Sequence, residues 1–188
     1  MLDRRHAVKM LLAERGEMLV VCGLGSPVYD AAAAGDDDRN FYLWGAMGGA
    51  VMIGLGLALA RPERRVLVLT GDGEMLMGLG SLATVAVQRP GNLAIVVLDN
   101  GAFGETGMQE SHTARSADLA AIAKGCGIPE TLDIGDETAL AALARRVQTM
   151  SGPIFARVRV GADEHERVLP LRDGVALKLR FRRALGIA

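Results

Sequence analysis

The stretch Val66-Leu67-Val68-Leu69-Thr70-Gly71-Asp72-Gly73 joins an apolar run, typical of a buried β-strand, to an aspartate between two glycines. A second apolar run, Leu93 to Leu98, ends in Asp99-Asn100-Gly101. The residues between the two runs leave room for one helix, so we expect the two strands to be parallel neighbours in one sheet. Asp72 and Asn100 should then lie at the carboxyl edge of that sheet, where open α/β sheets bind their ligands.

The residue types at these two strand ends favour binding of a metal-held phosphate group. Carboxylate and amide oxygens are the hard ligands that Mg²⁺ prefers, and Gly73 lets backbone amides approach an anion. A helix expected to begin near Met75 would direct its unpaired first-turn amides to the same place. Asp-Gly alone is also an ordinary turn dipeptide, so the evidence lies in the spacing to Asn100.

The composition is that of one compact enzyme domain. The chain has 188 residues, 50% of them hydrophobic, which is enough for one core, so we expect a single domain over residues 1–188. A formal net charge of -1 provides no broad positive field, and we expect neither a nucleic acid nor a membrane partner. The two cysteines, Cys22 and Cys126, are too few for a disulfide framework, which favours buried thiols and a cytoplasmic location.

One segment raises the question of a membrane span. Leu43 to Ala60 carries no charge and has the length at which spanning becomes possible. Its five glycines suit a helix packed tightly against a sheet, and the first residues of the chain lack a signal-peptide core. We therefore expect a buried helix at this segment.

Strand-like and helix-like segments alternate along the chain. Such alternation, with continuous apolar strands, predicts a three-layer α/β/α fold with a mostly parallel sheet. We expect a solvated charged turn at 35–38 and a helix cap at Asp136. The expected strands are 18–22, 66–70, 93–98, 131–134 and 154–160; the expected helices are 4–14, 27–33, the glycine-rich run ending at 60, 75–88, 116–124, 137–150 and 171–185.

A dinucleotide site is the alternative interpretation of the glycine clusters. Gly23-Leu24-Gly25-Ser26 follows a predicted strand, as the Rossmann fingerprint does. The third glycine of that fingerprint is missing, and no acidic residue stands out about 20 positions further on. The dinucleotide interpretation is therefore the weaker one.

The spacing Gly-Asp-Gly, then 26 residues, then Asn100 resembles the cofactor motif of thiamine-diphosphate-dependent enzymes. The resemblance implies the thiamine-diphosphate-binding fold for the diphosphate end of the cofactor, together with Mg²⁺. Asp72, the carboxamide of Asn100 and the main-chain carbonyl of Ala102 are the metal ligands that it implies.

Two further segments extend this resemblance. Phe41 to Gly48 looks like the family segment whose large apolar side chain lies beneath the cofactor and forces its bent shape, and Met47 takes that role here. Gly25-Ser26 resembles a second contact to the diphosphate. The cofactor-binding residues implied are Gly25, Ser26, Gly45, Met47, Gly71, Asp72, Gly73, Glu74, Asn100, Ala102, Phe103 and Gly104.

The loop from Asp99 to Thr113 is similar to the cofactor-binding half of sulfopyruvate and phosphonopyruvate decarboxylases, and so are 78–84 and 89–93. That resemblance implies a decarboxylase that converts a 2-oxo acid bearing a sulfonate or phosphonate to an aldehyde and CO₂. His112, in the loop expected to cover the cofactor, is the predicted catalytic residue, and Arg115 follows closely.

The resemblance also implies a partner. Enzymes of this kind need a glutamate that hydrogen-bonds the cofactor's aminopyrimidine, and that glutamate lies on a separate pyrimidine-binding domain. One sheet and its helices use up this chain. We therefore expect a pyrimidine-binding (alpha) subunit and a hetero-oligomer, in which this chain is the beta subunit.

Glu74 departs from the family pattern, since relatives often carry a small hydroxyl residue directly after Gly-Asp-Gly. Two like charges about 5 Å apart repel by roughly 3 kcal/mol at an effective dielectric of 20. We expect Glu74 to turn away from the diphosphate, to be offset by a cation, or to lower cofactor affinity. Two other functions stay open, namely a subunit of an acetolactate-synthase-like carboligase or oxidoreductase, and a non-catalytic cofactor-binding subunit.

Overall fold

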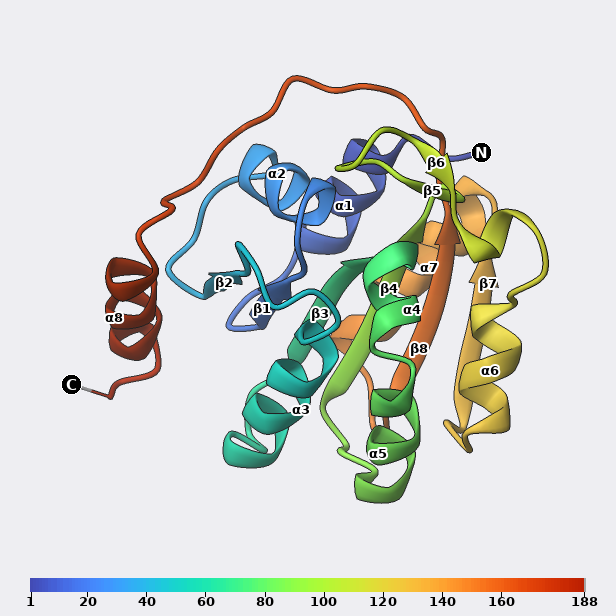
Figure 1. The fold of residues 1–188 in the computed structure, drawn as a ribbon. Helices are drawn as coiled ribbons and strands as arrows, with labels where there is room; N and C mark the ends of the chain where they lie inside the picture. Colours follow the sequence, from blue (N-terminus) through green and yellow to red (C-terminus); the bar gives the residue numbers. More distant parts are fainter. Residues whose placement is uncertain (188) are drawn as a thin grey trace.

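The computed structural model describes residues 1–187, which form one six-stranded sheet with helices on both faces (Figure 1). All neighbouring strands in this sheet are parallel, which confirms the predicted three-layer fold. A short antiparallel pair, β5 (Ala102–Phe103) and β6 (Gln109–Glu110), lies apart from it. The order across the sheet is β2 (Asn40–Tyr42), β1 (Leu19–Cys22), β3 (Val66–Gly71), β4 (Leu93–Asp99), β8 (Ile154–Arg159) and β7 (Glu130–Ile134).

The helices fill the connections between strands, as parallel crossovers require. One apolar cluster lies on each face of the sheet, and the two clusters share its strands. The helices are α1 (Arg4–Leu12), α2 (Ser26–Ala33), α3 (Ala50–Ala60), α4 (Asp72–Met77), α5 (Gly80–Gln88), α6 (Leu119–Gly125), α7 (Glu137–Gln148) and α8 (Gly174–Ala184), with a 3₁₀ turn η1 (His112–Ala114).

The central strands β3 and β4 fix where the site lies. Every residue of β4 is buried, and so is every residue of β3 except Gly71. Their register pairs Val66 with Leu93 and Gly71 with Leu98. Asp72 and Asn100 therefore follow neighbouring strands at one edge of the sheet.

Several predicted helix boundaries were wrong. The helix predicted over 75–88 is two helices, because Gly78 packs its backbone against Gly48, where a Cβ would meet the Gly48 carbonyl oxygen at 2.5 Å. The glycine-rich run becomes helical only at Ala50. The helices α6 and α8 begin after Asp118 and Asp173, whose side chains accept hydrogen bonds from first-turn amides. The predicted cap at Asp136 is confirmed, since its side chain accepts from the amide of Ala139.

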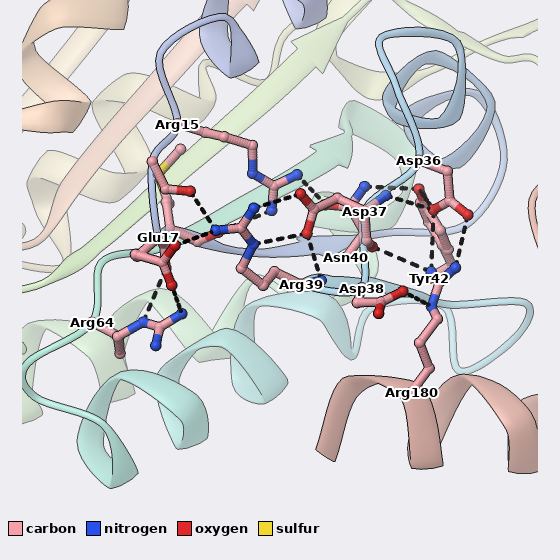
Figure 2. Close-up of polar contacts among 12 residues, drawn as sticks. Arg15, Glu17, Asp36, Asp37, Asp38, Arg39, Asn40, Tyr42, Arg64 and Arg180 are labelled. Atoms are coloured by element: carbon pink, nitrogen blue, oxygen red, sulfur yellow. Dashed lines mark hydrogen bonds and ion pairs between the residues drawn. The ribbon is translucent and has the colours of Figure 1, made fainter. Parts of the chain in front are cut away.

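Strand β2 was not predicted, and the acidic turn before it is less free than expected (Figure 2). Asp37 accepts hydrogen bonds from the guanidinium of Arg39 at 2.7 and 2.8 Å, and Asp36 accepts from Arg180 of α8 at 2.7 and 3.1 Å. The turn is largely exposed, and the Arg180–Asp36 ion pair connects it to the terminal helix.

The membrane alternative does not fit the helices. The most apolar of them, α3, has 11 residues and is about 16 Å long at 1.5 Å per residue, roughly half the hydrocarbon thickness of a bilayer. Within residues 1–187, no helix combines the length and the apolar character that a membrane span needs.

Candidate active site

A cavity of about 140 Å³ lies at the carboxyl edge of the sheet, at the ends of β3 and β4. Met47, Asp72 and Asn100, which are far apart in the sequence, all line it. Of the predicted cofactor-binding residues, all but Gly25 and Gly45 lie in its wall. The fold brings them together because parallel strands end at the same edge.

Asp72 is the buried carboxylate at this edge, with 2% of its surface exposed. Its Oδ2 accepts hydrogen bonds from the hydroxyls of Ser111 and Thr113, the latter at 3.1 Å. Burial raises the pKa of Asp72, and the charge of Asp99 adds to the rise, while the two hydroxyls oppose it. A desolvated carboxylate of this kind gains from a nearby cation.

The sequence did not single out the hydroxyls that hold Asp72. The Thr113 hydroxyl lies 2.7 Å from Asp99 Oδ1 as well as 3.1 Å from Asp72 Oδ2, so it connects the two carboxylates. Ser111 Oγ and Thr113 Oγ1 are 2.9 Å apart. Both hydroxyls belong to the segment directly after β6. This segment lies over Asp72 only in the folded protein.

Asp99 has a cation that the sequence could have revealed. Arg157 donates from Nε to Asp99 Oδ2 at 2.6 Å, and the Arg157 side chain is 17% exposed. Arg157 stands between the buried residues Ala156 and Val158 of β8. A charged residue inside a buried strand needs a partner, and that was the available signal.

Asn100 and Ala102 form a tight turn directly after β4. The amide of Ala102 donates to Asn100 Oδ1 at 3.0 Å, which fixes the orientation of the carboxamide. A carbonyl oxygen has two lone pairs, so one remains for a metal ion. The turn thus places two of the three predicted metal ligands, the Asn100 carboxamide and the Ala102 carbonyl, close together in the chain.

Glu74 lines the cavity, and its carboxylate is hydrogen-bonded within the protein, which is consistent with the first of the three expected outcomes. Its carboxylate is 4% exposed and accepts from the Thr70 hydroxyl at 2.9 Å and the Ala50 amide at 3.4 Å. Burial raises its pKa, which hydrogen bonds from Thr70 and from the amides of Ala50, Gly48 and Leu24 oppose. At Gly23 a Cβ would come within 1.7 Å of Glu74 Oε2, so only glycine fits there.

Met47 lies in a strained turn that projects it into the cavity wall. The turn runs from Ala46, whose φ is +54°, to Gly49, whose amide donates to the Ala46 carbonyl at 2.8 Å. Gly48 has a φ of +89° and packs against Met77 and Gly78. A left-handed alanine beside a predicted cofactor contact is the kind of strain that functional sites retain.

Three predicted site residues lie outside the cavity wall. Gly25 borders it through Glu105, whose Cγ would be 2.8 Å from a Cβ at position 25. A Cβ at Gly45 would contact nothing within 4 Å. His112 is exposed on η1, with its ring edge-on to Phe103 at 6.2 Å between centroids. Its catalytic role stays a prediction.

The donor set suits Mg²⁺ held with a phosphate group. Within residues 1–187, no group of three or more His, Cys, Asp and Glu side chains is arranged to hold a metal ion. The predicted site does not need one, because a carboxylate, a carboxamide and a main-chain carbonyl leave octahedral positions for phosphate oxygens and water. Arg157 pairs with Asp99, whereas the carboxylate of Asp72 accepts hydrogen bonds from two neutral hydroxyls, so a cation beside Asp72 would add a favourable interaction.

Comparisons with known proteins identify the family. Residues 31–158 match the family "Thiamine pyrophosphate enzyme, C-terminal TPP binding domain", thiamine pyrophosphate being thiamine diphosphate. The chain therefore belongs to the thiamine-diphosphate-dependent enzymes, and the predicted cofactor is confirmed.

Individual relatives point in the same direction. The chain is 45% identical over 163 residues to sulfopyruvate decarboxylase subunit beta of Methanothermobacter thermautotrophicus, covering 85% of this chain and 83% of the relative. It is 46% identical over 125 residues to phosphonopyruvate decarboxylase of Streptomyces viridochromogenes, covering 66% of this chain and 31% of that protein.

Solved structures support the fold. Benzoylformate decarboxylase from Polynucleobacter necessarius superposes with a TM-score of 0.73 at 18% identity, over 90% of this chain and 34% of that one. The chain thus spans about a third of the longer enzymes and most of the beta subunit. The predicted resemblance is confirmed.

Proposed function

We propose that this chain is the diphosphate-binding subunit of a thiamine-diphosphate- and Mg²⁺-dependent decarboxylase. Its substrate would be a 2-oxo acid that carries a sulfonate or phosphonate, and its products an aldehyde and CO₂. The observation that carries the proposal is the single cavity that joins Asp72, Asn100 and Met47. The names of the two relatives described above support the reaction and the substrate class.

The chain's own residues would hold and shape the cofactor. Asp72, the Asn100 carboxamide and the Ala102 carbonyl would bind Mg²⁺, and the amide of Gly73, in the first turn of α4, would donate to the phosphate. Met47 would support the cofactor ring from below. When bound, thiamine diphosphate supplies the electron sink for loss of CO₂ from a 2-oxo acid.

A second subunit would complete the active site. We define the α3–α5 face by four exposed apolar side chains, Met52 and Leu59 of α3, Met77 of α4 and Val87 of α5, which are 45 to 78% exposed. Figure 1 shows these helices together on one face of the sheet, and Met47, 39% exposed, links the face to the cavity. Exposed apolar surface of this kind marks an interface, which fits a pyrimidine-binding alpha subunit.

Domain organisation and location are part of the proposal. One sheet with an apolar cluster on each face supports a single domain over residues 1–188. Cys22 and Cys126 are both free, Cys22 being buried, which supports a reducing, cytoplasmic location. Fractionation of the source cells would test the location.

Co-purification with the alpha subunit tests the proposed function. The purified complex would be assayed for aldehyde release from 3-sulfopyruvate, 3-phosphonopyruvate and pyruvate, with Mg²⁺ and thiamine diphosphate. We expect the complex to release aldehyde from 3-sulfopyruvate or 3-phosphonopyruvate, and this chain alone to release none. A carbon–carbon coupled product would indicate a carboligase instead, and activity from the isolated chain would contradict the need for a partner.

A further inference from the structure

A second cavity, of about 330 Å³, lies beside the first. Ser26, Asn100 and Gly104 line both cavities, so the second is reached through the residues predicted to surround the diphosphate. Residues 162–165 and Arg167 of the extended segment 161–173 line it; Figure 1 shows this segment arching from the end of β8 past α2 to α8. Arg4, the first residue of α1, also lines both cavities.

Arg4 is held in place by a buried acid that it shares with its neighbour. Its Nε donates to Asp30 Oδ2 at 2.5 Å, and Arg5 donates from Nε to Asp30 Oδ1 at 3.2 Å. Asp30 is fully buried and the Arg4 side chain is 11% exposed. One carboxylate thus faces two guanidinium groups, and the trio carries a net positive charge.

The two arginines differ in where their other N–H groups lie. Arg5 directs Nη2 to the carbonyl of Glu166 at 2.6 Å and is not part of either cavity wall. Arg4 uses Nε for Asp30, which leaves its terminal amino groups for an acceptor at the cavity wall. A planar guanidinium with two free N–H groups matches the oxygens of a phosphate or sulfonate.

Of the acidic residues that line a cavity with Arg4, Asp72 and Glu74 in the first cavity accept hydrogen bonds from other groups. Glu105 lines both cavities, but Arg167 Nη2 lies 3.9 Å from its Oε2 and balances it. Asp163 and Glu164 line only the second cavity and are exposed, so water and salt screen them. Among the residues that line both cavities, the cation is Arg4, whose side chain is partly buried.

We propose that Arg4 is an anion-binding residue at the junction of the two cavities. Its terminal N–H groups donate to a tetrahedral oxyanion, which is either the terminal phosphate of the cofactor or the sulfonate or phosphonate of the substrate. This inference rests on the proposed function, since both candidate anions belong to that reaction.

Arg4→Gln and Arg5→Gln form a matched pair for the test. Both remove one guanidinium from Asp30 and keep an amide that can donate to it, so their effects on folding should be similar. Only Arg4→Gln removes a cation from the cavities. Binding of thiamine diphosphate with Mg²⁺ to the complete two-subunit complex would be measured by titration calorimetry, and KM would be compared for 3-sulfopyruvate and pyruvate.

The two measurements separate the two sources of the anion. If Arg4 binds the cofactor's phosphate, Arg4→Gln weakens thiamine diphosphate binding at least tenfold and Arg5→Gln by less than twofold. If it binds the substrate's anion, cofactor binding is kept and the KM ratio of 3-sulfopyruvate to pyruvate rises at least tenfold. Arg4→Lys, which keeps the charge, should recover most of either loss.

Other outcomes would overturn the inference. Equal effects of Arg4→Gln and Arg5→Gln in both measurements would show a purely structural role. If Arg4→Gln does not fold, Arg4→Met is compared with Arg5→Met, since both remove the charge and keep most of the side-chain length, and equal cofactor affinities and KM ratios for that pair would overturn it too. The wild-type complex could decarboxylate no 2-oxo acid while Arg4→Gln still loses cofactor binding. That result would support the role of Arg4 and contradict the proposed function.

Discussion

Asp72 is a carboxyl group that the metal-free protein buries beside a second carboxylate, Asp99. Its raised pKa means that the folded chain binds this proton more tightly than the unfolded chain does. The stability contribution is therefore most favourable below the ordinary pKa of 3.8 and declines as pH rises toward the raised folded value. Removal of the charge should relieve this cost.

We expect Asp72→Asn to raise the melting temperature of the metal-free chain at pH 7 by about 2–4 °C, which corresponds to about 1 kcal/mol. The gain should shrink as pH falls toward 4. The same variant should weaken Mg²⁺-dependent thiamine diphosphate binding at least tenfold. Thermal scans in EDTA across pH and a binding titration measure both, with exposed Glu63→Gln as control. A variant that melts lower at every pH would contradict the electrostatic account.

Glu74 stabilises the fold through its hydrogen bonds, because its carboxylate accepts from donors that are buried. Glu74→Ala would leave the Thr70 hydroxyl and the Ala50 amide without their acceptor, at a cost of about 1–3 kcal/mol in the free energy of unfolding. Glu74→Gln keeps an acceptor and should lose less. Urea denaturation compares the two. Equal stabilities of wild type and Glu74→Ala would show that the buried hydrogen bonds contribute nothing.

At the scale of elements, the terminal helix α8 makes one apolar and one ionic contact beside the edge strand β2. Phe181 is 5% exposed and packs edge-on against Phe41 of β2 at 5.3 Å, while Arg180 pairs with Asp36 near the surface (Figure 2). Burial of an aromatic ring stabilises more than a solvated ion pair does. The helix therefore depends on its apolar contact.

We expect Phe181→Ala to lower the free energy of unfolding by about 3 kcal/mol, and Arg180→Ala by at most about 1 kcal/mol. Urea denaturation of both variants measures the difference, and hydrogen exchange within α8 should rise more in Phe181→Ala. A larger loss for Arg180→Ala would show that the polar network at the β2 edge, and not the aromatic packing, secures the helix.

The sequence predicted best those elements whose formation depends on residues close together in the chain. Buried strands β3 and β4 were recognisable because continuous apolar runs have few other uses. Caps at Asp118 and Asp173 fixed helix starts that apolar spacing alone placed three residues too early. The break at Gly78 depends on Gly48, a contact between segments distant in sequence that no local pattern reveals.

At the scale of the whole molecule, the α3–α5 face gives a test of assembly. We expect Leu59→Glu and Met77→Glu, at positions 50% and 64% exposed, to prevent co-purification with the alpha subunit while leaving the melting temperature within about 2 °C of wild type. Val175→Glu, at 63% exposure on α8, is the matched control and should leave assembly intact. Unchanged assembly in both test variants would place the partner elsewhere.

The sequence by itself determined the α/β class and the family, and it predicted metal and diphosphate ligands at two strand ends, because these depend on apolar runs and on a fixed spacing along the chain. The tertiary structure decided what surrounds those ligands. Ser111 and Thr113 reach Asp72, Arg157 balances Asp99, Glu74 accepts a hydrogen bond from Thr70, and Arg4 lies where two cavities join. Side chains from distant segments meet only when parallel strands align their ends and the loops close over them, so their spacing along the chain carries no signal.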